Sequence, residues 1–434
     1  MIGNWLGCTF FVLTLVGCGV IWIANLALLA QLFSYLALRR FGLALEQKRL
    51  ATPLPSESEL PDVVVQIPSF NEGPIVERGI ANAMKLDWPK EKLHIQLCDD
   101  STDQTTEIAR TAAAKAVAQG FDVEVIHRTN RKGFKAGSLQ EAMTQTDYQY
   151  FAILDVDFIS PPDFLRRCMA VLLSDPHIAF VQTRMDFLNA NANVLTRAQA
   201  LLLDQHFALE QPTRSWSGQA MPFNGTSGVW RRKAIELGGG WRGETLSEDW
   251  ELSYHARLQG MSGVFISSVA AAGELPTDWR SWVTQQKRWA KGTGQVAWKM
   301  LPRVFSHGGL SAQYRLATFV PLVMWFLYAM FTGTYLLMIP ALLLVPPSQA
   351  LLLGLIVYLS YCGMFWIQAA VQWTATRAAG RRLTLKQFAL DYLAVPFLGL
   401  YISWLHFRSA PAIVLGREAV FMRTPKRGSS ATVA

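Results

Sequence analysis

The sequence predicts an α/β domain of the Rossmann-like type that is inserted between transmembrane helices. Charged residues make up only 17% of the 434 residues, against roughly 25% in soluble domains. These charges are unevenly distributed, because residues 1–38 carry none and residues 50–315 carry nearly all of the acids. Within residues 61–183, short β-rich runs alternate with longer helical stretches, which is typical of a mainly parallel sheet covered by helices.

An N-terminal membrane anchor is expected over residues 1–40. Its uncharged part, residues 1–38, exceeds the roughly 20 residues that a helix needs to cross the hydrocarbon core. It lacks the basic start and the small-residue cleavage site of a secretory signal. Basic residues follow this stretch and none precedes it. The positive-inside rule therefore predicts a multi-pass membrane protein whose next domain is cytoplasmic.

A cytoplasmic domain is expected over residues 50–280. Its strands are expected at residues 63–67, 93–97, 122–126 and 150–154. Its helices are expected at residues 74–86, 104–118 and 134–144. In sheets of this kind, ligands bind outside the carboxyl ends of the strands. The residues that follow each strand are therefore candidates for chemistry.

Polar side chains follow three of these strands. Asp99 and Asp100 follow the second strand, and Asp155 and Asp157 follow the fourth. The first strand leads into four candidate ligand-binding residues, Pro68, Ser69, Asn71 and Glu72. Asp and Ser also cap helices, which is the alternative for each strand end taken alone. Three such ends, together with the Asp-x-Asp spacing, favour a binding site.

The Asp155-x-Asp157 spacing predicts a site for a divalent cation, Mg²⁺ or Mn²⁺. Alternate residues at a strand end let one carboxylate bind the ion directly while the other binds through water or contacts a ribose. Mg²⁺ takes one or two carboxylates and completes its shell with substrate phosphates. With Asp99 and Asp100 one strand away, these acids indicate a nucleotide-diphosphate site. Lys135 is placed to neutralise phosphate, unless it is a solvated lysine at a helix start.

Two segments beyond residue 200 are further candidates. Residues 223–230 place small polar side chains, among them Thr226, between aromatic ones. Ser247 is a plausible N-cap of a helix that starts with Glu248 and Asp249. A helix dipole also favours acids in the first turn, which is the alternative to a catalytic role for both.

An interfacial amphipathic helix is expected within residues 281–315. It contains Gln285, Arg288 and Trp289 near its start. A tryptophan- and arginine-rich membrane anchor is the alternative interpretation of these residues.

A C-terminal transmembrane region is expected over residues 316–407, with clear spans at residues 316–339 and 350–373. Its last apolar stretch, residues 388–407, is either a single crossing or a hairpin or interface-lying helix, bent at one of two prolines, Pro396 or Pro411. A single crossing would leave several basic residues outside. The positive-inside rule therefore favours the second alternative, with residues 408–434 as a cytoplasmic tail.

The motifs, taken in order, resemble those of a known family. Those of the chain are Asp99-Asp100, Asp155-x-Asp157, Ser247-Glu248-Asp249 and Gln285-x-x-Arg288-Trp289. They are similar to the D, DxD, TED and QxxRW motifs of processive membrane glycosyltransferases of family 2, the cellulose-synthase and hyaluronan-synthase group. Ser247 stands where threonine is usual. Runs such as Phe223-Asn224-Gly225-Thr226 most resemble the plant cellulose-synthase-like A and C proteins, which are mannan and glucan synthases.

The resemblance implies a GT-A fold, a nucleotide-sugar donor, a divalent metal and inversion at the anomeric carbon. It makes Asp249 the general base, with Glu248 beside it. The residues expected at the donor are Pro68, Ser69, Asn71, Glu72, Asp99, Asp100, Lys135 and Asp155, with Asp155 and Asp157 at the metal. Those expected at the diphosphate and acceptor are Thr226, Gln285, Arg288 and Trp289. A gating loop over the nucleotide is implied for Phe421, Thr424 and Lys426.

The expected function is an inverting membrane glycosyltransferase that transfers a hexose from a nucleotide sugar to a growing β-glycan. UDP-glucose is the favoured donor and GDP-mannose the other candidate. The alternative is a glycolipid synthase that adds one or a few sugars to a lipid acceptor. No nucleic acid is expected as a partner, because the basic residues behind the net charge of +8 cluster at membrane-segment ends. A homo-oligomer or an export partner, and a bacterial inner, plasma or Golgi-like membrane, stay open.

Overall fold

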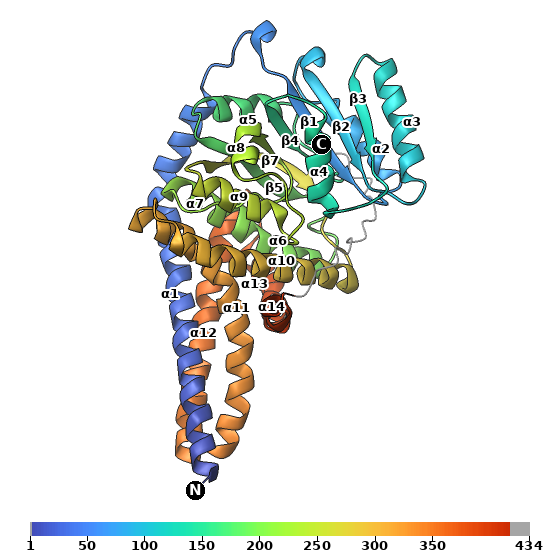
Figure 1. Ribbon diagram of the computed structural model, residues 1–434. Helices are drawn as coiled ribbons and strands as arrows, with labels where there is room; N and C mark the ends of the chain where they lie inside the picture. Colours follow the sequence, from blue (N-terminus) through green and yellow to red (C-terminus); the bar gives the residue numbers. More distant parts are fainter. Residues whose placement is uncertain (1, 417–434) are drawn as a thin grey trace.

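Helix α1, Ile2–Leu50, starts at the far end of a helical bundle and runs along it to an α/β domain (Figure 1). The structure, a computed structural model, describes residues 2–416 of the chain. The last turn of α1, next to the domain, carries Lys48 and Arg49. The division into bundle and domain therefore follows the uneven distribution of charge along the chain.

A seven-stranded mixed sheet forms the centre of the domain, with the strand order β3-β2-β1-β4-β6-β5-β7. β1 to β4 pair in parallel, β6 is antiparallel to both β4 and β5, and β7 is parallel to β5. The strands are β1 (Val63–Ser69), β2 (Leu93–Asp99), β3 (Asp122–His127), β4 (Tyr150–Ile153), β5 (Ile178–Phe187), β6 (Gly228–Arg231) and β7 (Ser262–Gly273). The first four strands lie where the sequence predicts them.

Alternate residues of the strands pack into two layers of helices, because successive side chains of a strand point to opposite faces. Val63 and Val65 of β1 pack in one layer, whereas Val64 packs in the other. The first layer contains α2 (Ile75–Ala83), α3 (Thr105–Ala118) and α5 (Phe164–Leu173). The second contains α4 (Phe134–Thr144), α8 (Arg232–Leu237) and α9 (Glu248–Leu258). With both faces covered, the strand ends are left for ligands.

A helical run of three segments connects the domain to the bundle. It consists of α6 (Val194–Asp204), η3 (Gln205–Glu210) and α7 (Gln211–Ser217). Asn193 caps α6 with its side chain, and Gly218 ends α7 in a left-handed conformation with φ of 71°. η3 is a single π-helical turn, and such turns occur frequently at functional sites.

Helices α11 (Ala312–Leu344) and α12 (Pro347–Ala378) lie beside α1 and complete the bundle (Figure 1). Both extend beyond the spans predicted from the sequence, and only Val345 and Pro346 separate them. α1 and α11 approach closely at Gly17, where a Cβ atom would lie 2.2 Å from Thr334 Oγ1. In the described part of the chain, four helical segments are long and apolar enough to cross a membrane: Trp5–Leu50, Ala312–Leu344, Pro347–Ala378 and Leu385–Val414.

The last of these segments is bent and lies at the junction of bundle and domain. It consists of α13 (Leu385–Tyr392) and α14 (Val395–Val414). The bend precedes Pro396, whereas Pro411 lies inside α14. Figure 1 shows α14 end-on beneath α10 (Trp279–Ser306), so both helices lie across the bundle. The choice between a single crossing and an interface-lying helix for this segment stays a prediction.

Candidate active site

The loops after β1 and β3 and the loop before β6 contain strained backbone. Among the described residues, four that are not glycine have positive φ angles: Asn71 (54°), Arg131 (40°), Phe134 (51°) and Ser227 (60°). Asn71 follows β1, Arg131 and Phe134 follow β3, and Ser227 precedes β6, which pairs with β4. Such conformations cost about 1–3 kcal/mol each and cluster at functional sites. The strained backbone therefore indicates the same edge of the sheet as the motifs.

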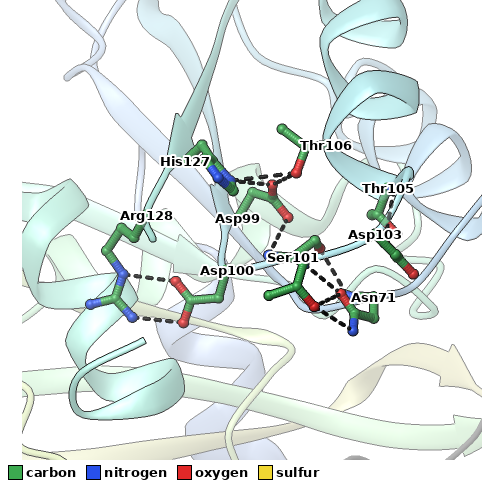
Figure 2. A network of polar contacts seen from close by, with 10 residues as sticks. Asn71, Asp99, Asp100, Ser101, Asp103, Thr105, Thr106, His127 and Arg128 are labelled. Atoms are coloured by element: carbon green, nitrogen blue, oxygen red, sulfur yellow. Dashed lines mark hydrogen bonds and ion pairs between the residues drawn. The ribbon is translucent and has the colours of Figure 1, made fainter. Parts of the chain in front are cut away.

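Asp99 and Asp100, at the end of β2, are buried and bound to other side chains (Figure 2). The guanidinium of Arg128 donates to Asp100 from Nε and Nη2, at 2.7 and 2.6 Å. Asp99 Oδ2 accepts from Thr106 Oγ1 at 2.6 Å and lies 2.9 Å from His127 Nδ1. The contacts with Arg128 and His127 join the ends of β2 and β3, because His127 is the last residue of β3 and Arg128 follows it. The donor contacts that the sequence predicts for both carboxylates stay a prediction.

The loop after β1 is shaped by Asn71. Its backbone N–H donates to Ser101 Oγ at 2.8 Å, and its Oδ1 accepts from the backbone N–H of Thr102 at 2.8 Å (Figure 2). Of the four residues that the sequence assigns to the donor here, Pro68 and Ser69 end β1, and Asn71 and Glu72 lie in this loop. The hydroxyl of Ser69 is buried without a hydrogen-bond partner within the described part of the chain.

Lys135 connects the end of β4 to the loop that precedes β6. Its Nζ donates to Asp155 Oδ1 at 2.6 Å and to the backbone oxygen of Gly225 at 2.8 Å. The backbone N–H of Asp155 donates in turn to Thr226 Oγ1 at 2.9 Å. The buried hydroxyl of Thr226 thus fixes the backbone of Asp155, and the diphosphate or acceptor contact that the sequence predicts for Thr226 stays a prediction.

Asp155 and Asp157 are the residues that fit a divalent cation at this edge. The side chain of Asp155 is 28% exposed, and Asp157 is buried two residues further on. The described residues contain no group of three or more His, Cys, Asp or Glu side chains that could hold a metal ion by themselves. A cation that completes its shell with substrate phosphates needs only one or two carboxylates. These two carboxylates therefore fit a cation that binds together with a diphosphate.

Glu248 and Asp249 begin α9, next to the same loop. Asp249 Oδ2 lies close to Gly225, since a Cβ atom on that glycine would be 3.3 Å away. Burial raises the pKa of Asp249, the charge of Glu248 raises it further, and Lys135 opposes the rise. Burial also raises the pKa of Glu248, against the charges of Lys135 and Arg288. A carboxylate with a raised pKa is the stronger base, which suits proton abstraction near neutral pH.

Helix α10 supplies a cation to these acids. Burial lowers the pKa of Arg288. Four nearby carboxylates oppose this effect, those of Glu248, Asp155, Asp249 and Asp157. Gln285 lies one turn earlier and is half-buried, whereas Trp289 keeps 37% of its surface exposed. The fold therefore brings the last motif of the sequence to the acids of the other motifs.

The predicted gating loop belongs to the chain beyond residue 416. Its three residues, Phe421, Thr424 and Lys426, lie outside the described residues. Their role stays a prediction.

Three polar residues of the site belong to no motif recognised in the sequence. Arg128 binds Asp100, as described above. Gln182 of β5 accepts from the backbone N–H of Asn224 at 2.9 Å and donates to the backbone oxygen of Thr226 at 3.0 Å. His206 Nε2 lies 2.9 Å from Asn224 Oδ1. Only Arg128 has a signal in the sequence, because a buried pair of acids requires a nearby cation.

A comparison with protein families agrees with this geometry. A family model described as "Glycosyltransferase like family 2" matches residues 61–292, which is more than half of the chain. The chain belongs to this family. The match runs from the start of the sheet into α10, so it contains every motif residue of the site that the structure describes. The resemblance to glycosyltransferases of family 2 is confirmed.

Two similar proteins from Arabidopsis thaliana carry related names. "Probable glucomannan 4-beta-mannosyltransferase 10" is 39% identical over 248 residues, which are 56% of this chain and 45% of that protein. "Glucomannan 4-beta-mannosyltransferase 2" is 38% identical over 251 residues, which are 57% of this chain and 47% of that protein. The chain spans less than half of the length of these relatives.

A solved structure confirms the predicted GT-A fold. It is the mannosyltransferase PcManGT from Pyrobaculum calidifontis, in complex with GDP-Man and Mn²⁺. The TM-score is 0.54 at 18% sequence identity, and the alignment covers 95% of this chain and 100% of that chain. At this identity the likeness concerns the fold alone.

The ion pair between Arg128 and Asp100 should contribute strongly to stability. Replacing Arg128 by Ala leaves a buried carboxylate without its cation, which should lower the free energy of unfolding by about 3–5 kcal/mol. The matched control is Arg166→Ala, because Arg166 pairs with the exposed carboxylates of Glu57 and Asp87 and should cost at most about 1 kcal/mol. Thermal unfolding of the purified variants in detergent measures both. Equal midpoints for the two variants would contradict the assignment of Asp100 as a buried structural acid.

Proposed function

We propose that this chain transfers mannose from GDP-mannose to the end of a growing β-glycan, with inversion at the anomeric carbon. The observation that carries the proposal is the convergence of Lys135, Asp155, Asp249 and Arg288 around Gly225 at one edge of the sheet. Cations beside carboxylates at such an edge suit a charged donor and an acceptor that must lose a proton. The names of the two plant relatives support mannose as the transferred sugar and a β-glycan as the product.

The donor is the point at which the proposal departs from the sequence prediction. The sequence favours UDP-glucose, but both named relatives are mannosyltransferases. We therefore favour GDP-mannose and treat UDP-glucose as the donor with which it must be compared.

The leaving diphosphate is bound by charges from two directions. Asp155 and Asp157 would hold a divalent cation, which, when bound, neutralises the charge that develops on the diphosphate. Lys135 Nζ adds positive charge from α4, beside Asp155. Arg288 adds it from α10, facing the same acids. In the proposed complex, these groups orient the donor so that its anomeric carbon faces Asp249.

Asp249 acts as the general base of a single displacement. Its carboxylate takes the proton of an acceptor hydroxyl while the acceptor oxygen forms a bond to the anomeric carbon of the donor. The bond from that carbon to the diphosphate oxygen breaks, and its electron pair leaves with GDP. Attack opposite the leaving group converts an α-linked donor into a β-linked product. The raised pKa of Asp249, caused by burial and by Glu248, makes it able to take this proton.

The domain is proposed to face the cytoplasm. The last turn of α1 carries Lys48 and Arg49, and the last turn of α12 carries Arg377, all at the end of the bundle next to the domain. The positive-inside rule favours the cytoplasm for this end. The apolar helices place the acceptor beside a lipid bilayer, so a lipid acceptor is the alternative to a glycan. A homo-oligomer or an export partner remains a prediction of the sequence.

Labelled donors test donor and product together. Membranes that contain the full chain should incorporate labelled mannose from GDP-mannose into a product that an endo-β-mannanase degrades. Incorporation from UDP-glucose alone would contradict the proposed donor. A product that partitions entirely into organic solvent would contradict glycan synthesis and support the glycolipid alternative.

Replacing Asp249 by Asn should remove the base while keeping the shape of the site. We expect the rate of transfer to fall by about 10²–10⁴-fold, with the affinity for GDP-mannose changed by no more than about twofold. Single-turnover transfer and equilibrium donor binding measure the two quantities. Glu236→Gln is the matched control, because its side chain is 56% exposed on α8, and it should leave both unchanged. Wild-type turnover in the Asp249 variant would refute the assigned base.

The rate of transfer should increase with pH through the raised pKa of Asp249, because only the deprotonated carboxylate accepts the proton. Replacing Glu248 by Gln removes a neighbouring negative charge. The pKa of Asp249 should then fall, so the increase in rate should move to lower pH. Initial rates between about pH 5 and pH 9 with saturating donor measure this shift. An increase that stays in place, or moves to higher pH, would show that Glu248 does not act on the base electrostatically.

A further inference from the structure

The loop of Asn224, Gly225 and Thr226 is held at Asn224 from two sides. Its backbone is bound to the sheet, since the N–H of Asn224 donates to Gln182 Oε1 at 2.9 Å. Its side-chain contact comes from outside the sheet, since Asn224 Oδ1 lies 2.9 Å from His206 Nε2. His206 belongs to the π-helical turn η3 and to none of the motifs of the site. The loop therefore depends on a histidine whose role the proposed mechanism does not yet include.

His206 is itself fixed within η3. Its Nδ1 lies 3.2 Å from Glu210 Oε2, and the other oxygen of Glu210 pairs with Arg214. Although burial favours the protonated acid, Arg214 and His206 lower the pKa of Glu210 to about 2. The ionised carboxylate only accepts hydrogen bonds, so Nδ1–H of His206 donates to it, and Nε2 faces Asn224 and the amide of Gln211, 3.3 Å away. An asparagine amide carries an accepting oxygen and a donating NH₂ group, so in either of its two orientations it presents a hydrogen-bonding atom to Nε2.

The π-turn is also bound to the membrane bundle. Gln205, the first residue of η3, accepts from Gln368 of α12 at 2.6 Å. One short segment thus contacts a bundle helix at Gln205 and the active-site loop at His206. The position of the loop therefore depends on contacts with the bundle as well as on contacts with the sheet.

We propose that His206 is a positioning residue for glycosyl transfer: its contact with Asn224 holds the Gly225 carbonyl and the Thr226 hydroxyl where they orient Lys135 and Asp155. The Gly225 carbonyl accepts from Lys135 Nζ at 2.8 Å, and Thr226 Oγ1 accepts from the backbone of Asp155 at 2.9 Å. A loop that shifts by about 1 Å misplaces both groups, and displacements of that size can reduce a rate by up to about 100-fold.

Two substitutions of His206 separate this role from a merely structural one. His206→Gln places an amide near the position of Nε2 and can still reach Asn224. His206→Asn places the amide near Nδ1, so it can reach Glu210 but not Asn224. The matched controls are the same two substitutions at His177, whose side chain is 79% exposed. Comparison of Gln with Asn at position 206 therefore tests the contact with Asn224 specifically.

The first measurement is the mobility of the loop. Hydrogen–deuterium exchange of a peptide that covers residues 221–228 should be about fivefold faster in His206→Asn, because one hydrogen bond contributes a factor of this size. It should remain at the wild-type rate in His206→Gln and in both His177 variants. Equal exchange in the Gln and Asn variants would overturn the proposal. This measurement needs no donor, so it stands even if GDP-mannose proves not to be the substrate.

The second measurement rests on the proposed function. With GDP-mannose, His206→Asn should lower kcat by about tenfold or more, and KM for the donor should change by no more than about twofold. His206→Gln should restore most of kcat. A failure of the wild-type chain to use GDP-mannose would refute the proposed function, not the positioning role. An active wild type with equally active Gln and Asn variants would overturn the positioning role alone.

Discussion

The hydrogen bond from the backbone of Asp155 to the hydroxyl of Thr226 joins the two halves of the domain, the parallel strands β1 to β4 and the segment that leads into β6. The parallel strands β1 to β4 end at the edge where the nucleotide is proposed to bind. β6 is antiparallel to β4, so the loop before β6 meets the end of β4 from the opposite direction. Because of this antiparallel pairing, Lys135 can reach a carboxylate of one half and a carbonyl of the other with one side chain. The positions of Lys135 and Asp155 therefore depend on this hydrogen bond.

Concentrating acids at one place is unfavourable, and the fold offsets the cost with cations from separate elements. Lys135 comes from α4 within the domain, whereas Arg288 comes from α10 at the junction with the bundle. The contribution of Arg288 makes the docking of α10 partly electrostatic, because the buried carboxylates need opposite charge nearby. The membrane-side part of the chain therefore does more than anchor the domain. It completes the charge balance on which donor binding is proposed to depend.

The sequence predicted the parallel half of the sheet because its buried strands are separated by helices in regular alternation. It placed Asp155 just after the fourth strand, where the structure has it. It could show that Asp99 and Asp100 lie at the edge but not what they bind, because the partner of Asp100, Arg128, follows another strand. The approach of Gly225 to Asp249 depends on the antiparallel position of β6, for which the sequence has no local signal. The periodicity of the sequence thus predicts helices and strands. Contacts between residues distant in the sequence decide which polar side chains are bound to other protein groups.

The raised pKa of Asp249, the proposed base, depends on tertiary structure in the same way. The start of a helix favours ionised carboxylates, so an exposed acid at this position would have a low pKa. The raised pKa shows that burial and the charge of Glu248 outweigh the helix start. Helix α10 packs against the residue before α9 so closely that a Cβ atom on Gly292 would lie 2.3 Å from Ser247 Oγ. Since only glycine permits this approach, the start of α9, which contains the proposed base, is shaped by its contact with α10.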